Sequence, residues 1–135
     1  MRPAPEVTER GSVSIVAVAL MSMALVLAMG AADLARVLTR AARAQTAADA
    51  AALAAAQELA VPSGRETPAE IAGFYARRND AELIACACDP GGTEAIVTVR
   101  VQVGALTFVS DDRVVSARAR AVVDVPGVVE TDGRL

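Results

Sequence analysis

The stretch that decides the fold is AARAQTAADAAALAAAQELA, residues Ala41–Ala60, in which most side chains are alanine. Alanine is the strongest intrinsic helix former, but it offers little apolar surface to a core. We therefore expect a helix that packs only where a neighbour approaches its backbone very closely. Small residues permit the same close approach between helices in membranes.

The residues before this stretch predict a membrane span. Residues 11–32, GSVSIVAVALMSMALVLAMGAA, carry no charged side chain. As a helix this segment is about 33 Å long, which matches a hydrocarbon core of about 30 Å. Neither glycine nor proline occurs between Gly30 and Pro62. We therefore expect one continuous helix from about Val13 to Ala60, ended by the Pro-Ser-Gly sequence at 62–64.

The alanine-rich half of this helix contains a row of residues at alternating steps of four and three, the spacing of a coiled-coil seam. The row is Leu34, Leu38, Ala41, Gln45, Ala48, Ala52, Ala55 and Leu59. We expect this helix packing seam to contact the protein's own sheet, neighbouring subunit helices, or both. The isolated carboxylates Asp49 and Glu58 are expected at the solvated surface. A basic stripe beside the seam, Arg36, Arg40 and Arg43, is suited to anionic lipid headgroups.

A short helix is predicted at TPAEIAGFYARRND, residues 67–80. Thr67 is the expected N-cap, Pro68 occupies the first helical position, and Glu70 completes a capping box. The expected apolar face of this helix consists of Ile71, Phe74 and Tyr75.

The hydrophobic period then changes to two, which is typical of strands. Alternation is weak in ELIACACD (82–89) and clear in TEAIVTVRVQV (93–103) and VVSARARAVVDV (114–125). Turn residues between these segments predict an antiparallel meander with one wet face. We expect the alanine-rich half of the long helix to cover the apolar face, together with Ile71 and Phe74.

The predicted fold class is therefore α+β and pilin-like: a long N-terminal helix, transmembrane in its lower half, with a short helix and a small three-stranded antiparallel sheet. The expected segments are an N-terminal tail (1–11), a transmembrane helix (12–32), its extramembrane continuation (33–61), a distal domain (62–127) and a flexible tail (128–135).

Cys86 and Cys88 are the two cysteines of the chain. In an extended strand their Cα atoms are about 7 Å apart, too far for a disulfide unless the chain bends. Asp89-Pro90-Gly91 follows directly and permits a bend. A C-x-C pair also binds soft metals, but no third cysteine or histidine completes such a site. Buried thiols, or a disulfide formed outside the cytoplasm, are the simpler interpretations, and we expect no cofactor or metal.

The composition argues against several function classes. The net charge is −3, whereas nucleic-acid-binding domains usually carry a basic surface. The chain has no histidine, and we find no nucleophile–base pair, P-loop or glycine-rich dinucleotide motif. We therefore expect neither enzymatic activity, nor a small-molecule substrate, nor a nucleic-acid partner. An alternative to the membrane anchor is a signal peptide cleaved near Ala32, which would release a secreted or surface-displayed interaction protein.

The orientation of the span is predicted from two opposing signals. Arginine is denser on the C-terminal side, which by the positive-inside rule would place the distal domain in the cytoplasm. Asp33 lies among these arginines, however, and a small β-domain behind a single N-terminal span is commonly exported. We expect a single-pass protein of the cell membrane with an extracytoplasmic distal domain.

Two segments carry a resemblance to a known family. RGSVSIVAVAL (10–20) and QTAADAAALA (45–54) resemble the N-terminal segment of TadE/TadG-like proteins of the tight-adherence (Flp) pilus system. The chain is particularly similar to short actinobacterial TadE-like proteins encoded beside secretion and helicase genes. The resemblance implies a pseudopilin-like or minor-pilin-like membrane component whose partners are other pilus or secretion-system subunits.

The same resemblance implies a processing site. It places prepilin-peptidase cleavage between Gly11 and Ser12. Many family members carry a glutamate five residues into the mature chain, and Val16 occupies that position here. TadG-like members often lack this glutamate and stay in the membrane as anchors, which this chain resembles more closely.

Overall fold

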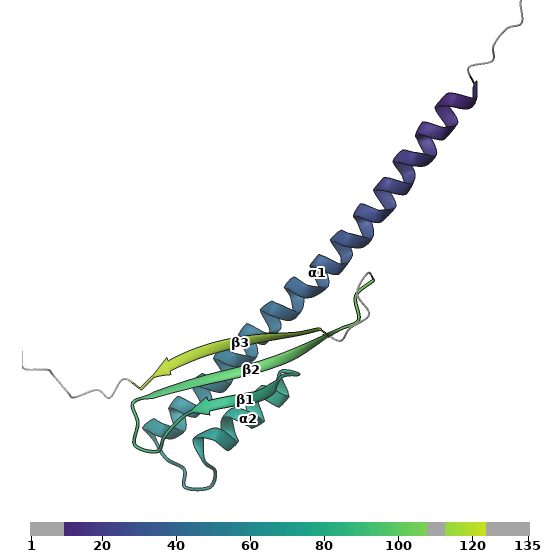
Figure 1. Ribbon diagram of the computed structural model, residues 1–135. Coiled ribbons are helices and arrows are strands. Elements are labelled where there is room, and N and C mark those ends of the chain that lie inside the picture. Colours follow the sequence, from purple (N-terminus) through teal and green to yellow (C-terminus); the bar gives the residue numbers. More distant parts are fainter. Residues whose placement is uncertain (1–9, 108–112, 124–135) are drawn as a thin grey trace, which may run out of the picture.

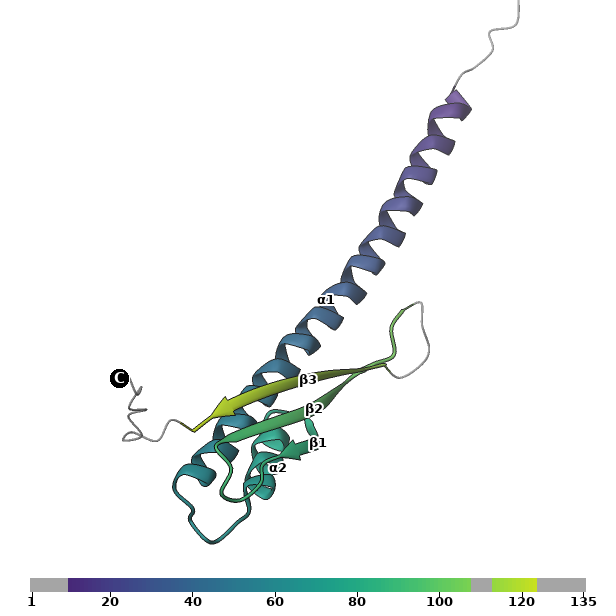
Figure 2. The ribbon, with the colours of Figure 1, turned by 60° about the vertical axis from the view of Figure 1, so that its left-hand side comes forward.

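The computed structural model describes residues 10–107 and 113–123, with the backbone alone at 10–12. Its elements are α1 (Arg10–Ala60), α2 (Pro68–Arg78), β1 (Glu82–Ala87), β2 (Glu94–Gly104) and β3 (Arg113–Val122). Figure 1 shows the N-terminal half of α1 projecting alone, while the other elements gather around its C-terminal half, and Figure 2 shows the same arrangement from a second side. The predicted α+β fold is confirmed. Of the N-terminal tail expected at 1–11, residues 10 and 11 belong to α1. Residues 1–9 and the tail expected at 128–135 lie outside the described residues.

Helix α1 is continuous over 51 residues, as its lack of interior proline predicts. It begins three residues before the expected Val13 and ends at the expected Ala60. Hydroxyl side chains inside it bond back to the preceding turn: the Ser22 Oγ donates to the Val18 carbonyl at 2.9 Å. A serine satisfied in this way costs little in an apolar surrounding.

The three strands form the expected antiparallel meander in the order β1-β2-β3. Cys86 of β1 lies opposite Val97 of β2, and Val99 of β2 lies opposite Ala117 of β3. The register of β1 shifts between Leu83 and Ala85. This irregularity accounts for the weak alternation of the β1 sequence.

The core lies between α1 and one face of the sheet. Val97 and Val99 of β2 are the largest fully buried side chains. Alanines of the C-terminal half of α1 lie against them, which confirms that this half covers the sheet. The helix side of the core consists of Ala44, Ala47, Ala48, Ala51, Ala52, Ala55 and Ala56. The sheet therefore sits close to the helix backbone, which answers why this stretch is alanine.

Helix α2 has the predicted capping box but not the predicted apolar face. Thr67 and Glu70 bond reciprocally around the N-terminus of α2. Phe74 and Tyr75 are 45% and 42% exposed, so the expectation that the aromatic residues face the core is wrong. The residues that α2 buries are Pro68, Ala72, Gly73 and Ala76. A second helix can approach the alanine face of α1 closely only through small side chains, and the aromatic rings are too large for that position.

Candidate functional site

The N-terminal half of α1 is an exposed apolar surface. Its large side chains range from 40% exposed at Met29 to 76% at Met21, and no described residue packs over them. By length and composition this helix can cross a membrane. An uninterrupted apolar surface on all sides of one helix is unfavourable in water and suits lipid. This fits a single-pass membrane protein.

The buried row of α1 is displaced by one residue from the predicted seam. Of the predicted residues, three alanines are buried, Ala41 and Leu59 are half-buried, and Leu34, Leu38 and Gln45 are exposed. The row that the fold buries or half-buries is Asp33, Val37, Arg40, Ala44, Ala47, Ala51, Ala54 and Glu58. Both rows have steps of four and three, and the buried alanines 48, 52 and 55 flank the second one. Contact of the predicted seam with neighbouring subunits remains a prediction.

The buried row begins and ends at a carboxylate. Because these two residues are charged, a search of the sequence for regularly spaced apolar residues does not find the row. Asp33 and Glu58 are each 8% exposed. The expectation that Glu58 is solvated is therefore wrong. Its Oε1 accepts from the Ser63 backbone N–H at 2.6 Å and from the Ser63 Oγ at 2.8 Å. A buried carboxylate requires hydrogen-bond donors, and Ser63 supplies them here. The two bonds fix the turn that follows α1 to the end of the helix.

Asp33 links the helix to the sheet where the apolar span ends. Its Oδ2 accepts from the Thr107 backbone N–H and its Oδ1 from the Thr107 Oγ1, both at 2.9 Å. The Arg36 guanidinium lies 3.5 Å from the same carboxylate. Hydrogen bonds to a charged acceptor are among the stronger ones. The segment after β2 is therefore held against α1 directly after the uncharged stretch 11–32.

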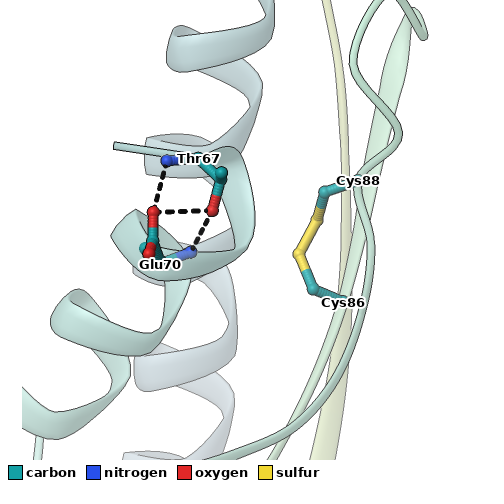
Figure 3. Close-up of a disulfide and its surroundings, with 4 residues drawn as sticks. All are labelled: Thr67, Glu70, Cys86 and Cys88. Atoms are coloured by element: carbon teal, nitrogen blue, oxygen red, sulfur yellow. Dashed lines mark hydrogen bonds between the residues drawn. A yellow bond between two sulfur atoms is a disulfide. The ribbon is translucent and has the colours of Figure 1, made fainter. Parts of the chain in front are cut away.

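Cys86 and Cys88 are joined by a disulfide, drawn in Figure 3. Cys88 follows the last residue of β1, and the two Cα atoms are 5.4 Å apart. The chain thus leaves the extended conformation at this point, as the neighbouring Pro-Gly sequence permits. Among the described residues no group of three or more metal-ligating side chains accompanies the pair.

The N-terminus of α2 faces the turn after Cys88 across an open hollow. Thr67 and Glu70 line one side of it and Pro90 and Gly91 the other. The Glu70 Oε2 accepts from the Thr67 backbone N–H at 2.7 Å and from its Oγ1 at 2.9 Å (Figure 3). These hydrogen bonds, the backbone one above all, lower the pKa of the Glu70 carboxyl.

The processing site implied by the resemblance, Gly11 and Ser12, lies in the first turn of α1. Only the backbone is described there. A helical backbone at this position does not test processing, so cleavage between these residues remains a prediction.

Part of the chain matches a known protein family. Residues 11–58 match the family described as "Putative Flp pilus-assembly TadE/G-like". The matched segment lies entirely inside α1 and contains both the exposed apolar half and most of the alanine-rich half. Neither the curated proteins nor the solved structures compared with the chain gave a match. The family likeness therefore rests on the helix, and the sheet carries none of it.

Proposed function

We propose that this chain is a membrane-anchored TadE/TadG-like structural component of a Flp/Tad-type pilus or secretion system, pseudopilin-like or minor-pilin-like. The observation that carries the proposal is the coincidence of the family match, residues 11–58, with α1. The role is assembly and not catalysis, since the matched family is described by pilus assembly. The partners are the membrane and other subunits of the same apparatus.

The side of α1 turned away from the sheet is the proposed contact surface for those subunits. Leu34, Leu38 and Leu53 are 57–60% exposed on this helix. Between them lie small or polar residues, with a Gln45–Asp49 hydrogen bond of 2.9 Å across one turn. A surface of separate leucines among small residues suits another helix packing alongside.

The disulfide supports an extracytoplasmic distal domain. Disulfides persist in oxidising compartments and are rare in the reducing cytosol. The Cys86–Cys88 bond lies in the distal domain, on the C-terminal side of the span. The number of arginines after the span points the other way, toward a cytoplasmic distal domain. We give the disulfide more weight, because a structural disulfide persists only in an oxidising compartment.

Orientation is tested with trypsin on intact spheroplasts. Arg65 lies in the exposed segment between α1 and α2 and offers a cleavage site. We expect cleavage without lysis, because the distal domain faces outward. Protection until the membrane is lysed would place the domain in the cytoplasm and contradict the proposed orientation.

The membrane-anchor role is tested by the N-terminus and intact mass of the mature chain, determined separately for membrane and culture-supernatant fractions. We expect a membrane form that keeps the span. A start at Ser12 would identify prepilin-type processing, and a start at Met1 a fixed anchor. A supernatant form starting between Ala31 and Asp33 would refute the anchor and establish the secreted alternative.

A further inference from the structure

A second surface lies beside α1 just beyond the predicted span. It is an open cleft of about 470 Å³ between α1 and the end of β2. Arg36, Arg40 and Arg43 line the helix side, and Val103 and Ala105 line the sheet side. The proposed contact with other pilus subunits uses the side of α1 turned away from the sheet, so it does not involve this cleft.

Among the described residues, three arginines and no carboxylate line the cleft. Arg36 shares the Asp33 carboxylate with Thr107. Within residues 10–107 and 113–123, neither Arg40 nor Arg43 forms an ion pair. Arg40 also lines a neighbouring hollow, which contains Arg77 and Arg100 together with the carboxylates of Asp80 and Glu82. Within the part of the chain that the structure describes, the first cleft thus combines three arginines with the one nearby carboxylate of Asp33.

The cleft begins at the height of the lipid headgroups and extends outward from the membrane. Arg36, Arg40 and Arg43 follow Ala32 by four, eight and eleven residues, which puts their Cα atoms about 6, 12 and 16 Å beyond the span, so the outer two arginines must reach back toward the headgroups. The headgroup layer on each side of a bilayer is roughly 5–7 Å thick. Side chains on a helix lean toward its N-terminus, which here is the direction of the bilayer, and arginine stems are long enough to reach back to the headgroups.

We propose that this arginine cleft binds the phosphate headgroup of an anionic phospholipid. A guanidinium donates two parallel hydrogen bonds to phosphate oxygens, and basic residues just outside a span attract anionic lipid. The inference rests on the membrane-anchor part of the proposed function. It also gives the arginines after the span a role other than setting orientation.

The test uses the full chain in neutral maltoside micelles with equal amounts of phosphatidylglycerol and phosphatidylcholine. Native mass spectrometry counts the lipids that remain bound. We expect roughly tenfold more phosphatidylglycerol than phosphatidylcholine, falling with added salt. The variant R40Q/R43Q should bring this ratio close to one. R65Q/R118Q, which removes the same charge from exposed positions outside the cleft, should leave the ratio unchanged.

Three results would overturn the proposal. An equal loss in both double variants would show that only net charge matters. Displacement of the lipid by an equal concentration of inorganic phosphate would make the cleft a free-anion site. Retention of the full preference in R40Q/R43Q, with helix content unchanged by circular dichroism, would exclude the cleft as the lipid site. Resistance of the wild-type chain to carbonate extraction from membranes tests the anchor separately, so failure of the anchor and failure of the cleft give different results.

Discussion

The two halves of α1 have the same backbone and opposite surroundings. In the N-terminal half the side chains are large and exposed, with Ile15, Leu20 and Leu25 all more than half accessible. In the C-terminal half the inward side chains are alanines, and Ala51 is completely buried. Large apolar residues thus lie where none of the described residues covers them, and the smallest ones lie in the core.

This contrast indicates that the size of the side chains on α1 depends on what packs against them, lipid or sheet, and not on how buried they are. Lipid chains adapt to any side-chain shape, so the membrane half can be built from large residues that bury well in hydrocarbon. A sheet is a fixed surface, and it contacts the helix closely only if the helix presents almost no side chain. The valines of β2 supply the apolar volume that the alanines lack.

The largest effect should come from enlarging one alanine in each half. We expect A51L to lower the free energy of unfolding of the distal domain by about 3 kcal/mol, because a leucine separates the helix from Val97 and Val99. A24L, in the exposed apolar half, should change it by less than about 0.5 kcal/mol. Urea titration of the full chain in micelles, followed by hydrogen exchange of β2 amides, measures both. Equal effects of the two variants would remove the distinction between the halves.

A42L is the control for the aqueous side of the same helix. Ala42 is exposed and lies away from the sheet. We expect its replacement to be as mild as A24L. A cost close to that of A51L would show that the backbone, and not the packed face, is sensitive to leucine.

The next effect concerns the boundary between the halves. We expect D33A to cost about 2 kcal/mol, because the Thr107 N–H and hydroxyl lose a charged acceptor. T107V keeps the N–H bond and removes only the hydroxyl, so it should cost about half as much. Hydrogen exchange of the Thr107 amide is the readout. An exchange rate unaffected by D33A would show that the segment after β2 is held by other contacts.

The two halves of α1 can be predicted from the sequence more reliably than the face of α1 that packs against the sheet. The continuous helix follows from the absence of proline between Arg10 and Pro62 and of glycine between Gly30 and Pro62, and the sheet follows from the alternating valines around Val99. Spacing could not choose between the two rows, because each has four alanines at the same steps, and hydropathy favoured the predicted row, which adds three leucines. Asp33 and Glu58 mark the true row, but a carboxylate in a core becomes recognisable only when its donors, Thr107 and Ser63, are placed beside it.

The face of α2 and the state of the cysteines were also not fixed by the sequence, because both depend on how neighbouring elements are placed. Phe74 has the spacing of a core residue, yet the close contact with α1 selects small side chains. By hydropathy a phenylalanine is a better core residue than an alanine. Where two helices lie very close together, however, only the alanine fits between them. For Cys86 and Cys88 the sequence left thiols and disulfide both open, since the bend that joins them depends on where β1 ends.

A smaller effect is expected from the disulfide, which exists only in the distal domain. It closes a loop of three residues, so chain entropy assigns it about 1–2 kcal/mol. Reduction of the wild-type chain should lower the unfolding free energy by this amount and leave the fold intact. C86A/C88A is the matched control, and its stability should not respond to the reductant. A response of the variant as large as that of the wild type would show that the reductant acts elsewhere.

The smallest effect concerns the pH dependence of the α2 N-terminus. Because the Thr67 hydrogen bonds lower the pKa of Glu70 in the folded chain, its ionised form stabilises the fold at pH values above the ordinary pKa of 4.5. This contribution is lost as the pH falls through the lowered value. Hydrogen exchange of the first α2 amides, measured from neutral pH downward, should show local loosening in that range. E70Q has no carboxyl to protonate and should lose the pH-dependent step while keeping a neutral side-chain cap. An identical acid response in E70Q and wild type would assign the loosening to another group.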